Sequence, residues 1–375
     1  MSARFLTVVL ERAFNMRDGF GREIDYMRIS VIDSCNLNCY YCNPCDNNEH
    51  CHALNILSVK EVLCIVRAAT RLGIKHFRLT GGEPLLHPQL DEMVLQIKKI
   101  PGVSSVSLTT NAVLLAQHAK QLKEAGIDSI NVSLDTIDAS EYEHITKKPL
   151  LEEVKHGINA AIECGIRVKI NVVLTPQTDV VALTRYASKK GTDIRFIEMM
   201  PVGEGHTNGV EPYEKVIGAL LEVYGTFCHI DTEKTKEINS GNDKRKIPDN
   251  GPAEYYIFPE LGIRVGLIQA IHGKFCDTCN RIRVTADGRL MPCLGSSVTM
   301  DLVPDSCEFT DDLEKDFVIV QALKAAIKAK PGCHNFNDNA VTYTKTTGTK
   351  TVETKATELK AAEVNAARNM SRIGG

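Results

Sequence analysis

The chain has 375 residues, 43% of them hydrophobic, with 44 Lys and Arg against 47 Asp and Glu and a net charge of −3. This length suits one large domain or two, and the near-neutral charge argues against a general nucleic-acid binder. The sequence shows neither a long apolar run nor a secretory signal, so we expect no membrane association and a cytoplasmic location. Thirteen cysteines is an odd number, and clustered cysteines in a reducing compartment indicate metal binding or catalysis.

Strand-like and helix-like segments alternate between about residues 23 and 200. The predicted strands are Tyr26–Ile32, His76–Leu79, Val103–Leu108, Ser129–Leu134, Val168–Leu174 and Ile194–Ile197. The predicted helices are Ser58–Leu72, Gln89–Ile100, Leu114–Ala125, Glu152–Glu163 and about 179–190. This alternation predicts parallel βαβ units in an α/β fold, either an incomplete barrel or an open sheet. The motifs that follow the strands are expected on one rim.

The pattern changes after about residue 204. Residues 232–253 are polar and predict a surface loop, Tyr255–Ile268 predicts two short strands, and 342–357 contains eight threonines. We therefore predict four parts: an N-terminal extension over 1–20, a partial barrel over 21–230, a C-terminal domain over 231–335, and a threonine-rich segment with a Gly-Gly tail over 336–375.

Two groups of three cysteines stand out. The first is Cys35, Cys39 and Cys42, spaced C-x3-C-x2-C directly after the first predicted strand. Three thiolates can hold three irons of a [4Fe–4S] cluster and leave the fourth iron open to a small molecule. The alternative is zinc, with His50 or His52 as the fourth ligand.

The second group is Cys276, Cys279 and Cys293, spaced C-x2-C-x13-C. It could again hold a cluster with an open iron, or a structural zinc with His272 as the fourth ligand. Within it lies Asn280-Arg281-Ile282-Arg283. Side chains alternate along a strand, so Arg281 and Arg283 share one face and suit an anion clamp; the alternative is a pair of solvated surface arginines.

The first cysteine loop, with Tyr41 inside it, and the turn Gly81-Gly82-Glu83-Pro84 after the second strand together resemble the radical S-adenosylmethionine superfamily. The resemblance implies an incomplete (βα)6 barrel of TIM type with a C-terminal iron–sulfur domain. It also implies that the open iron chelates S-adenosylmethionine, and that reduction of the cluster produces a 5′-deoxyadenosyl radical.

The segment FCDTCNRIRVTADGRLMPCL, Met370-Ser371 and the terminal Gly374-Gly375 resemble the molybdenum-cofactor GTP 3′,8-cyclase family. The resemblance implies a lyase with two [4Fe–4S] clusters and S-adenosylmethionine that cyclises GTP to 3′,8-cyclo-7,8-dihydro-GTP. It further implies a reducing electron donor and delivery of the product to cyclic pyranopterin monophosphate synthase, and it is compatible with a homodimer.

The resemblance also assigns roles to individual residues. Those expected to line the S-adenosylmethionine site are Tyr41, Gly82, Ser133 and Met200. Those expected to contact GTP are Arg28, Arg78, Thr109, Lys169, Arg281, Ile282 and Arg283. Those expected to act in the later chemical steps are Arg281, Arg283, Gly374 and Gly375. Arg195 is a secondary basic candidate.

Simpler interpretations exist for several of these residues. Arg28 and Arg78 could pair with Asp33 or Glu83, Lys169 could extend to solvent from a strand end, and Ser133-Leu134-Asp135 could cap a helix. For the whole chain, the alternatives are another radical enzyme with an auxiliary cluster, such as a peptide maturase, and a zinc-binding interaction protein.

Overall fold

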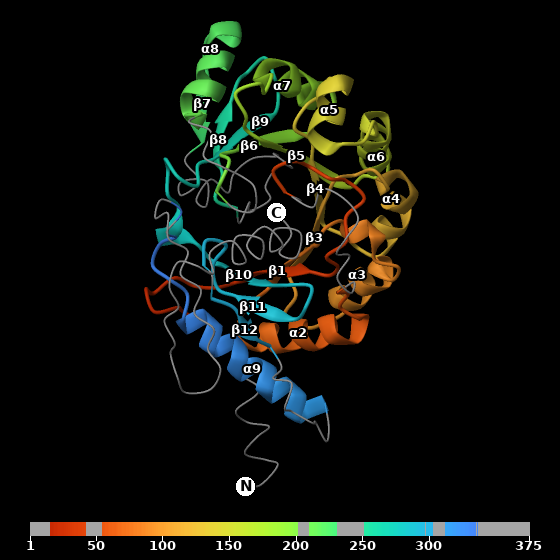
Figure 1. Cartoon of the computed structure of the whole chain (residues 1–375), viewed down its shortest axis with the longest axis vertical. Coiled ribbons are helices and arrows are strands. Elements are labelled where there is room, and N and C mark those ends of the chain that lie inside the picture. The colour runs from red at the N-terminus through yellow and green to blue at the C-terminus, as the bar shows by residue number, and fades with distance from the viewer. Residues whose placement is uncertain are drawn as a thin grey trace, which may run out of the picture.

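One twelve-stranded mixed sheet forms the centre of the molecule. The structure is a computed structural model, and it describes residues 16–42, 55–201, 210–230, 251–296, 298–302, 312–334 and 336. The strand order is β12-β11-β10-β1-β2-β3-β4-β5-β6-β9-β8-β7. The sheet curves around a central space, and helices cover its outer face (Figure 1). Within the described part of the chain, no helix has the length and apolar character needed to cross a membrane.

Six parallel strands with intervening helices make up the N-terminal part, as the alternation predicts. The strands are β1 (Tyr26–Ser30), β2 (His76–Thr80), β3 (Ser105–Thr110), β4 (Ser129–Ser133), β5 (Arg167–Val173) and β6 (Asp193–Ile197). The helices are α2 (Val59–Arg71), α3 (Leu90–Lys98), α4 (Leu115–Glu124), α5 (Ala139–Thr146), α6 (Leu151–Glu163) and α7 (Val180–Lys189). Of these, α5 is the one that the sequence did not predict.

Local signals explain where these helices begin and end. Ser58 caps α2 and Glu61 returns a hydrogen bond to the Ser58 backbone, so a capping box marks the start of this helix. Gly126 and Gly165 follow α4 and α6 with φ of +89° and +68°, a conformation that glycine adopts without a steric penalty. The inner apolar side chains of the helices pack on the strands in one continuous core.

The C-terminal part of the chain extends this sheet on both sides. Its strands are β7 (Cys228–Ile230), β8 (Glu254–Ile257), β9 (Arg264–Ile268), β10 (Arg281–Val284), β11 (Arg289–Met291) and β12 (Met300–Asp301). β9 pairs in parallel with β6, and β10 pairs in parallel with β1. The strands of both parts thus belong to one sheet, and a domain boundary at residue 230 stays a prediction.

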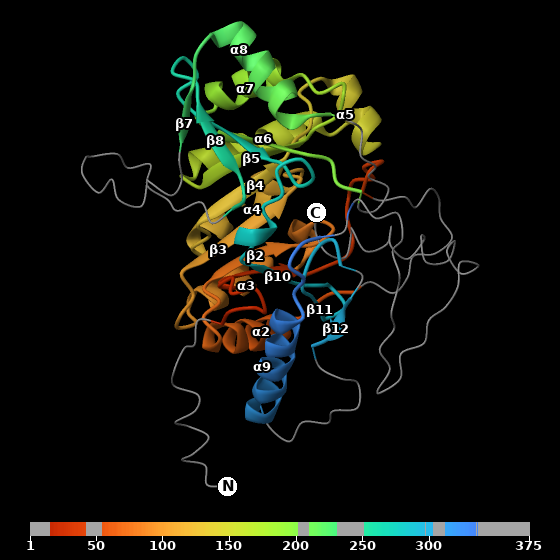
Figure 2. The ribbon, with the colours of Figure 1, turned by 90° about the vertical axis from the view of Figure 1, so that its left-hand side faces the viewer.

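Two helical segments that the sequence did not predict complete this part: α8 (Ala219–Tyr224), which continues from a π-helical turn at Glu214–Gly218, and α9 (Asp312–Lys328). Helix α9 packs beside α2, as Figure 2 shows. An ion pair of 3.0 Å between Arg71 Nη2 and Asp316 Oδ2 joins the two helices. The C-terminal part is therefore anchored to the first βα unit of the barrel.

The strand register places three arginines side by side. Arg28 on β1 is the partner of Arg78 on β2 and of Arg283 on β10. These side chains lie at one level on adjacent strands and line the interior. Like charges in adjacent register repel one another, so this row requires an anion or structural compensation.

Candidate active site

A cavity of about 730 Å³ runs through the interior of the partial barrel. At the carboxyl ends of the strands its wall includes Gly81, Asn111 and Asp135, and at the amino ends it includes His76 and Ser105. Both three-cysteine groups also line it. The cavity therefore spans the length of the strands.

The two cysteine groups lie at opposite ends of the strands. The first follows the carboxyl end of β1, whereas Cys276 and Cys279 precede the amino end of β10, which is parallel to β1. At about 3.3 Å per residue, the five residues of β1 span roughly 16 Å. The cavity between the groups thus has room for a nucleotide-sized substrate.

Helix α5 and the end of β4 hold the first cysteine loop in place. Asn38 N donates to Thr146 O at 3.0 Å and Tyr40 N to Ile145 O at 3.1 Å, so the loop is hydrogen-bonded to the last turn of α5. The hydroxyl of Tyr41 donates to Asp135, whose other oxygen accepts from the backbone at Val173. The residue that caps α5 is Asp138. The alternative in which Ser133-Leu134-Asp135 serves as the helix cap therefore does not apply to α5.

The turn after β2 packs directly against this loop. Gly82 N donates to Ile32 O and Glu83 N donates to Ser34 O, both at 2.7 Å. A Cβ at Gly82 would lie 2.2 Å from the carbonyl oxygen of Ser34. The glycines therefore allow close approach of the cysteine-loop backbone itself.

Glu83 links this turn to the end of β3. Its buried carboxylate accepts from Thr110 Oγ1 and from Asn111 N, both at 2.7 Å, and burial raises its pKa to about 7. The amide of Asn111 then donates to Asn36 Oδ1 at 2.7 Å, inside the cysteine loop. A chain of hydrogen bonds thus connects two strand ends to the first cysteine group.

The thiols of the first group lie in an environment that opposes their ionisation. Burial raises the pKa of Cys35 to about 12 and that of Cys42 to about 11, and it raises the pKa of Cys39 further. Asp135 adds to the shifts at Cys39 and Cys42. Cys42 adds to those at Cys35 and Cys39, and Cys35 adds to that at Cys39. Bound iron has to compensate this cost, because metal ligands bind as thiolates.

This set of donors fits a [4Fe–4S] cluster with one open iron. All three cysteines of the first group line the cavity, where they could bind one cluster. Among the described residues, no three His, Cys, Asp or Glu side chains are arranged to hold a single metal ion. His50 and His52, the proposed zinc ligands, lie outside the described residues, as do Cys45 and Cys51.

The second group has the same number of thiols in a cationic setting. Cys279 N donates to Cys276 O at 3.1 Å and closes the C-x2-C turn. Burial raises the pKa of Cys276. Burial would also raise that of Cys279, but Arg281 and Lys330 outweigh it and lower the pKa of this thiol. His272, the alternative zinc ligand, instead pairs with Glu198 and is half-exposed.

The arginines beside the second group face the cavity as the alternation predicts. Arg283 is 8% exposed, and burial and then Arg281 lower its pKa to about 10. Its Nη1 is buried and has no hydrogen-bond partner within the described structure. This buried, unpartnered donor fits an anionic substrate. The side chain of Ile282 packs in the core and is not among the residues that line the cavity, because it points to the other face of β10. Its assignment to GTP stays a prediction.

The other cations expected to contact the substrate also line the cavity. Arg78 donates to Tyr26 Oη and, at 3.3 Å, to Thr109 Oγ1. Burial and then Arg283 lower the pKa of Arg28. Lys169 is 5% exposed inside β5, so it does not extend to solvent. The carboxylates suggested as alternative partners are engaged elsewhere: Asp33 accepts from Asn55, and Glu83 from Thr110 and Asn111.

The residues assigned to the S-adenosylmethionine site lie in the first cysteine loop and at or just after the carboxyl ends of β2, β4 and β6. All four line the cavity: Tyr41, Gly82, Ser133 and Met200. Gly374 and Gly375 lie outside the described residues.

Several cavity residues were missed by sequence reasoning. Asn131 Oδ1 is buried without a hydrogen-bond partner in the described structure, and Asn171 accepts from Arg195 Nε at 3.0 Å. Both line the cavity. The sequence held a signal for them, because polar residues at every second position of an otherwise apolar barrel strand indicate side chains that face the barrel interior.

Comparisons with known proteins agree with this geometry. Residues 29–183 match the model of the Radical SAM superfamily, and residues 192–336 match that of Molybdenum Cofactor Synthesis C. Two solved structures share the fold. Streptococcus suis SuiB bound to precursor peptide SuiA has a TM-score of 0.52 and 16% identity, and the match covers 85% of this chain and 67% of SuiB. Native anSMEcpe with bound AdoMet has a TM-score of 0.50 and 17% identity, and the match covers 81% of this chain and 84% of anSMEcpe. The chain is a radical S-adenosylmethionine protein with an incomplete barrel.

Curated relatives narrow the class. A GTP 3′,8-cyclase from Clostridium perfringens (strain SM101) is 36% identical over 325 residues, covering 86% of this chain and 95% of the relative. Those from Pelotomaculum thermopropionicum and Listeria monocytogenes (serovar 1/2a) are also 36% identical, over 85% of this chain and 95% and 92% of their own lengths. The chain belongs to the GTP 3′,8-cyclase family, which confirms the resemblance seen in the sequence and the S-adenosylmethionine and [4Fe–4S] cofactors that it implies.

Proposed function

We propose that this protein converts GTP to 3′,8-cyclo-7,8-dihydro-GTP with cleavage of S-adenosylmethionine, the first step of molybdenum cofactor biosynthesis. The observation that carries the proposal is one cavity that joins two three-cysteine groups at opposite strand ends, with a row of arginines between them. Family membership supports the same reaction.

The cysteines would hold the two clusters. Cys35, Cys39 and Cys42 would bind the first cluster, and Cys276, Cys279 and Cys293 the second. When bound, the first cluster and S-adenosylmethionine supply the radical chemistry that removes hydrogen from the ribose. With the three cysteines of its group as ligands, each cluster would keep one iron for a small-molecule ligand.

The chain's own contribution at the first site is to orient S-adenosylmethionine. Gly82, Ser133 and Met200 would contact it from three strand ends, and Tyr41 would contact the adenine through its backbone. The hydrogen bond from Tyr41 to Asp135 fixes that backbone. Walls built by the strand ends on several sides reduce the access of water.

The chain's contribution at the second site is to bind and position GTP. Among the described residues, eight Arg or Lys side chains line the cavity against three carboxylates, which favours a triphosphate. The row Arg28, Arg78 and Arg283, with Thr109 and Lys169, would hold the phosphates and ribose, and guanine would lie at the second cysteine group. Fixing the ribose and base in one geometry is the main catalytic requirement of a cyclisation.

Further assignments extend this proposal. Arg281 and Arg283, and the terminal Gly374 and Gly375, would act in the steps after hydrogen removal, and the backbone of Ile282 would lie along GTP. The family likeness also extends the proposal to a cytoplasmic enzyme that takes electrons from a reducing donor, passes its product to cyclic pyranopterin monophosphate synthase, and assembles as a homodimer.

Iron analysis combined with a product assay tests the function. After anaerobic reconstitution we expect about eight irons per chain, four for each cluster, and formation of 5′-deoxyadenosine that depends on GTP and not on added peptides. Cys35→Ser and Cys279→Ser should each remove about half of the iron. Cys228→Ser, at an exposed thiol on β7, is the matched control and should retain all of it. Bound zinc with no iron, or peptide-dependent 5′-deoxyadenosine, would contradict the proposal.

A further inference from the structure

A turn near the start of the described chain contacts the second cysteine group. Arg22 N donates to Asp18 Oδ1 at 3.0 Å and Arg22 Nε to Asp18 Oδ2 at 2.6 Å, and the Asp18 side chain is fully buried. The ring of Phe20 lies 5.3 Å from the guanidinium of Arg22. Asp18 therefore sets the direction of a nearly buried arginine.

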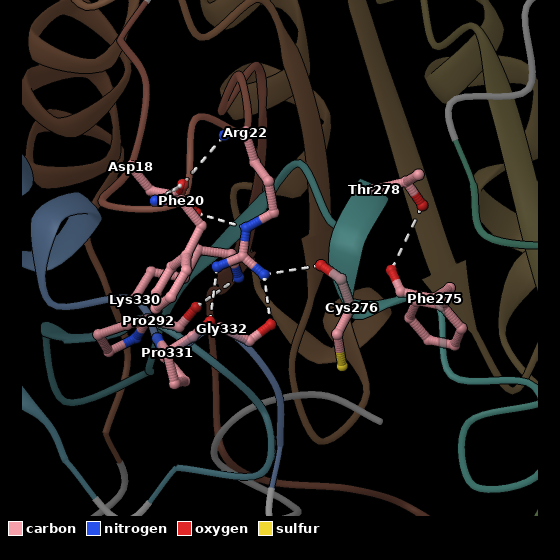
Figure 3. Close-up of polar contacts among 10 residues, drawn as sticks. All are labelled: Asp18, Phe20, Arg22, Phe275, Cys276, Thr278, Pro292, Lys330, Pro331 and Gly332. Carbon is pink, nitrogen blue, oxygen red and sulfur yellow. Dashed lines mark hydrogen bonds and ion pairs between the residues drawn. The ribbon is translucent and has the colours of Figure 1, made fainter.

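The remaining nitrogens of Arg22 donate to backbone carbonyls from two distant segments. Nη1 donates to Cys276 O at 2.6 Å and to Gly332 O at 3.0 Å, and Nη2 donates to Pro331 O at 2.6 Å. Figure 3 shows this fork reaching from the Asp18 turn to the cysteine loop. The carbonyl of Cys276 also accepts the hydrogen bond from Cys279 N that closes the C-x2-C turn. Arg22 thus holds the carbonyl on which that turn depends.

Lys330 reaches the other two cysteines from the segment after α9. It is 4% exposed, and its Nζ donates to Pro292 O at 3.0 Å, the carbonyl directly before Cys293. Lys330 and Cys279 both line the cavity, and the positive charge of Lys330 helps to lower the pKa of this thiol. Arg22 binds Pro331 O, one residue along the chain, so the two cations hold one short segment against the group (Figure 3).

We propose that Arg22 and Lys330 are positioning residues of the second cysteine group, where Arg22 fixes its backbone and Lys330 places a positive charge beside its sulfur ligands. This inference rests on the proposed function, because it assumes a cluster on these cysteines. Hydrogen bonds and charges around the ligands of a metal group orient them and tune the reduction potential. The two residues thus have separable roles: one controls occupancy, the other the potential.

The test uses the full-length chain with Cys35, Cys39 and Cys42 replaced by Ser, so that about four irons report the second cluster alone. In this background Lys330→Met should retain the iron but lower the equilibrium constant for reduction about tenfold, about 59 mV for one electron, because a nearby positive charge is lost. Lys330→Arg should restore the potential. An unchanged potential in Lys330→Met overturns the role of Lys330.

Arg22→Met should lose most of the iron and the electron paramagnetic resonance signal of the reduced second cluster. The guanidinium of Arg22 donates to Asp18 and to three carbonyls from three nitrogens, whereas a lysine has one nitrogen with three donors. Arg22→Lys cannot keep all four contacts, so it should shift that signal even if Arg22→Met fails to fold. The matched control is Arg71→Met, which breaks the ion pair between α2 and α9 without contacting the cysteine group. Full iron and an unaltered signal in the Arg22 variants, or the same loss in Arg71→Met, overturns the role of Arg22.

Failure of the proposed function gives a different result. If the second group holds no cluster, the triple-serine chain contains no iron with any residue at positions 22 and 330. If the function holds and the inference fails, the triple-serine chain contains about four irons, and the variants at Arg22 and Lys330 match it in iron and in potential.

Discussion

The two cysteine groups have the same number of thiols and line the same cavity, but their electrostatic surroundings are opposite. Asp135 and Glu83 lie near the first group and raise the pKa of its thiols together with burial. Arg281 and Lys330 lie near the second group and lower the pKa of Cys279 against the effect of burial. A single ligand pattern therefore serves two different electrostatic tasks.

This difference matches the chemistry expected at each end. A cluster that has to deliver an electron to S-adenosylmethionine benefits from negative neighbours, because they make the reduced state less stable and the cluster more reducing. A cluster that has to bind an electron-rich base beside a triphosphate benefits from positive neighbours. The positions of charged residues, more than the cysteines themselves, distinguish the two sites.

The largest expected effect concerns the contact between Gly82 and the first cysteine loop. Gly82→Ala places a Cβ 2.2 Å from Ser34 O. Backbone hydrogen bonds hold the Gly82 turn tightly against the segment that contains Ser34, so the cysteine loop has to move. We expect loss of the first cluster, about four of eight irons, and of S-adenosylmethionine cleavage. Gly218→Ala is the control, since nothing lies within 4 Å of its added Cβ. A full iron content in Gly82→Ala would show that the loop tolerates the displacement.

The next effect concerns the arginine row next to the second group. Arg283→Met removes a buried cation with an unpartnered donor, so GTP binding should weaken by about 2–4 kcal/mol, roughly 30- to 1,000-fold in Kd. Arg283→Lys should recover only part of this, because it lacks the planar fork. Arg289→Met, at a half-exposed position on β11, should leave Kd unchanged. Equilibrium binding of GTP to the reconstituted protein measures all three.

A smaller effect tests the contrast in charge directly. Asp135→Asn removes a negative charge near the first group, so the equilibrium constant for reduction of the first cluster should rise about tenfold at pH 8. Burial raises the pKa of Asp135 to about 6, so its carboxylate is ionised at that pH. The second cluster, at the other strand end, should keep its potential. If both potentials move equally, the charges of the cavity act on both groups and the contrast between them fails.

The sequence predicted most of the barrel because its strands and helices alternate with clear turn residues. Ser58 and Glu61 mark the start of α2, and Gly126 and Gly165 mark two helix ends. It missed α5 because the segment after Asp138 is short and polar, and its helical state depends on the cysteine loop that it binds. Local signals are sufficient where a helix packs on the sheet and insufficient where tertiary contacts decide.

The candidate site was predictable to the extent that its residues lie in motifs. The spacing of the motifs predicts the cysteines, Gly82 and Arg283 as site residues. Asn131 also lines the cavity, but it lies in no motif, and its only signal is a polar residue that alternates with apolar ones along a buried strand. Arg22 is separated by 254 residues in sequence from Cys276, which it contacts. No pattern along the chain relates two such residues, because only the addition of β10 beside β1 brings them together.

The last effect concerns the response of the protein to acid at a carboxylate outside both cysteine groups. Asp193, where β5, β6 and β9 meet, accepts from Arg264 Nη2 at 2.5 Å and lies 3.4 Å from Arg167 Nη2. Burial opposes ionisation, but Arg264 and then Arg167 outweigh it and lower the pKa of Asp193. A lowered pKa in the folded state means that its stabilisation is present above the unfolded value of about 3.9 and is lost as pH falls through the folded value.

Asp193→Asn should therefore destabilise the metal-free protein by about 1–3 kcal/mol at pH 7, and the difference from the unaltered chain should shrink as pH falls below about 4. Urea unfolding at several pH values measures this. The thiols of the first group have a raised pKa, so they are neutral throughout this range and add no acid dependence of their own. A difference that stays constant down to pH 2.5 would mean that Asp193 contributes through packing and not through its charge.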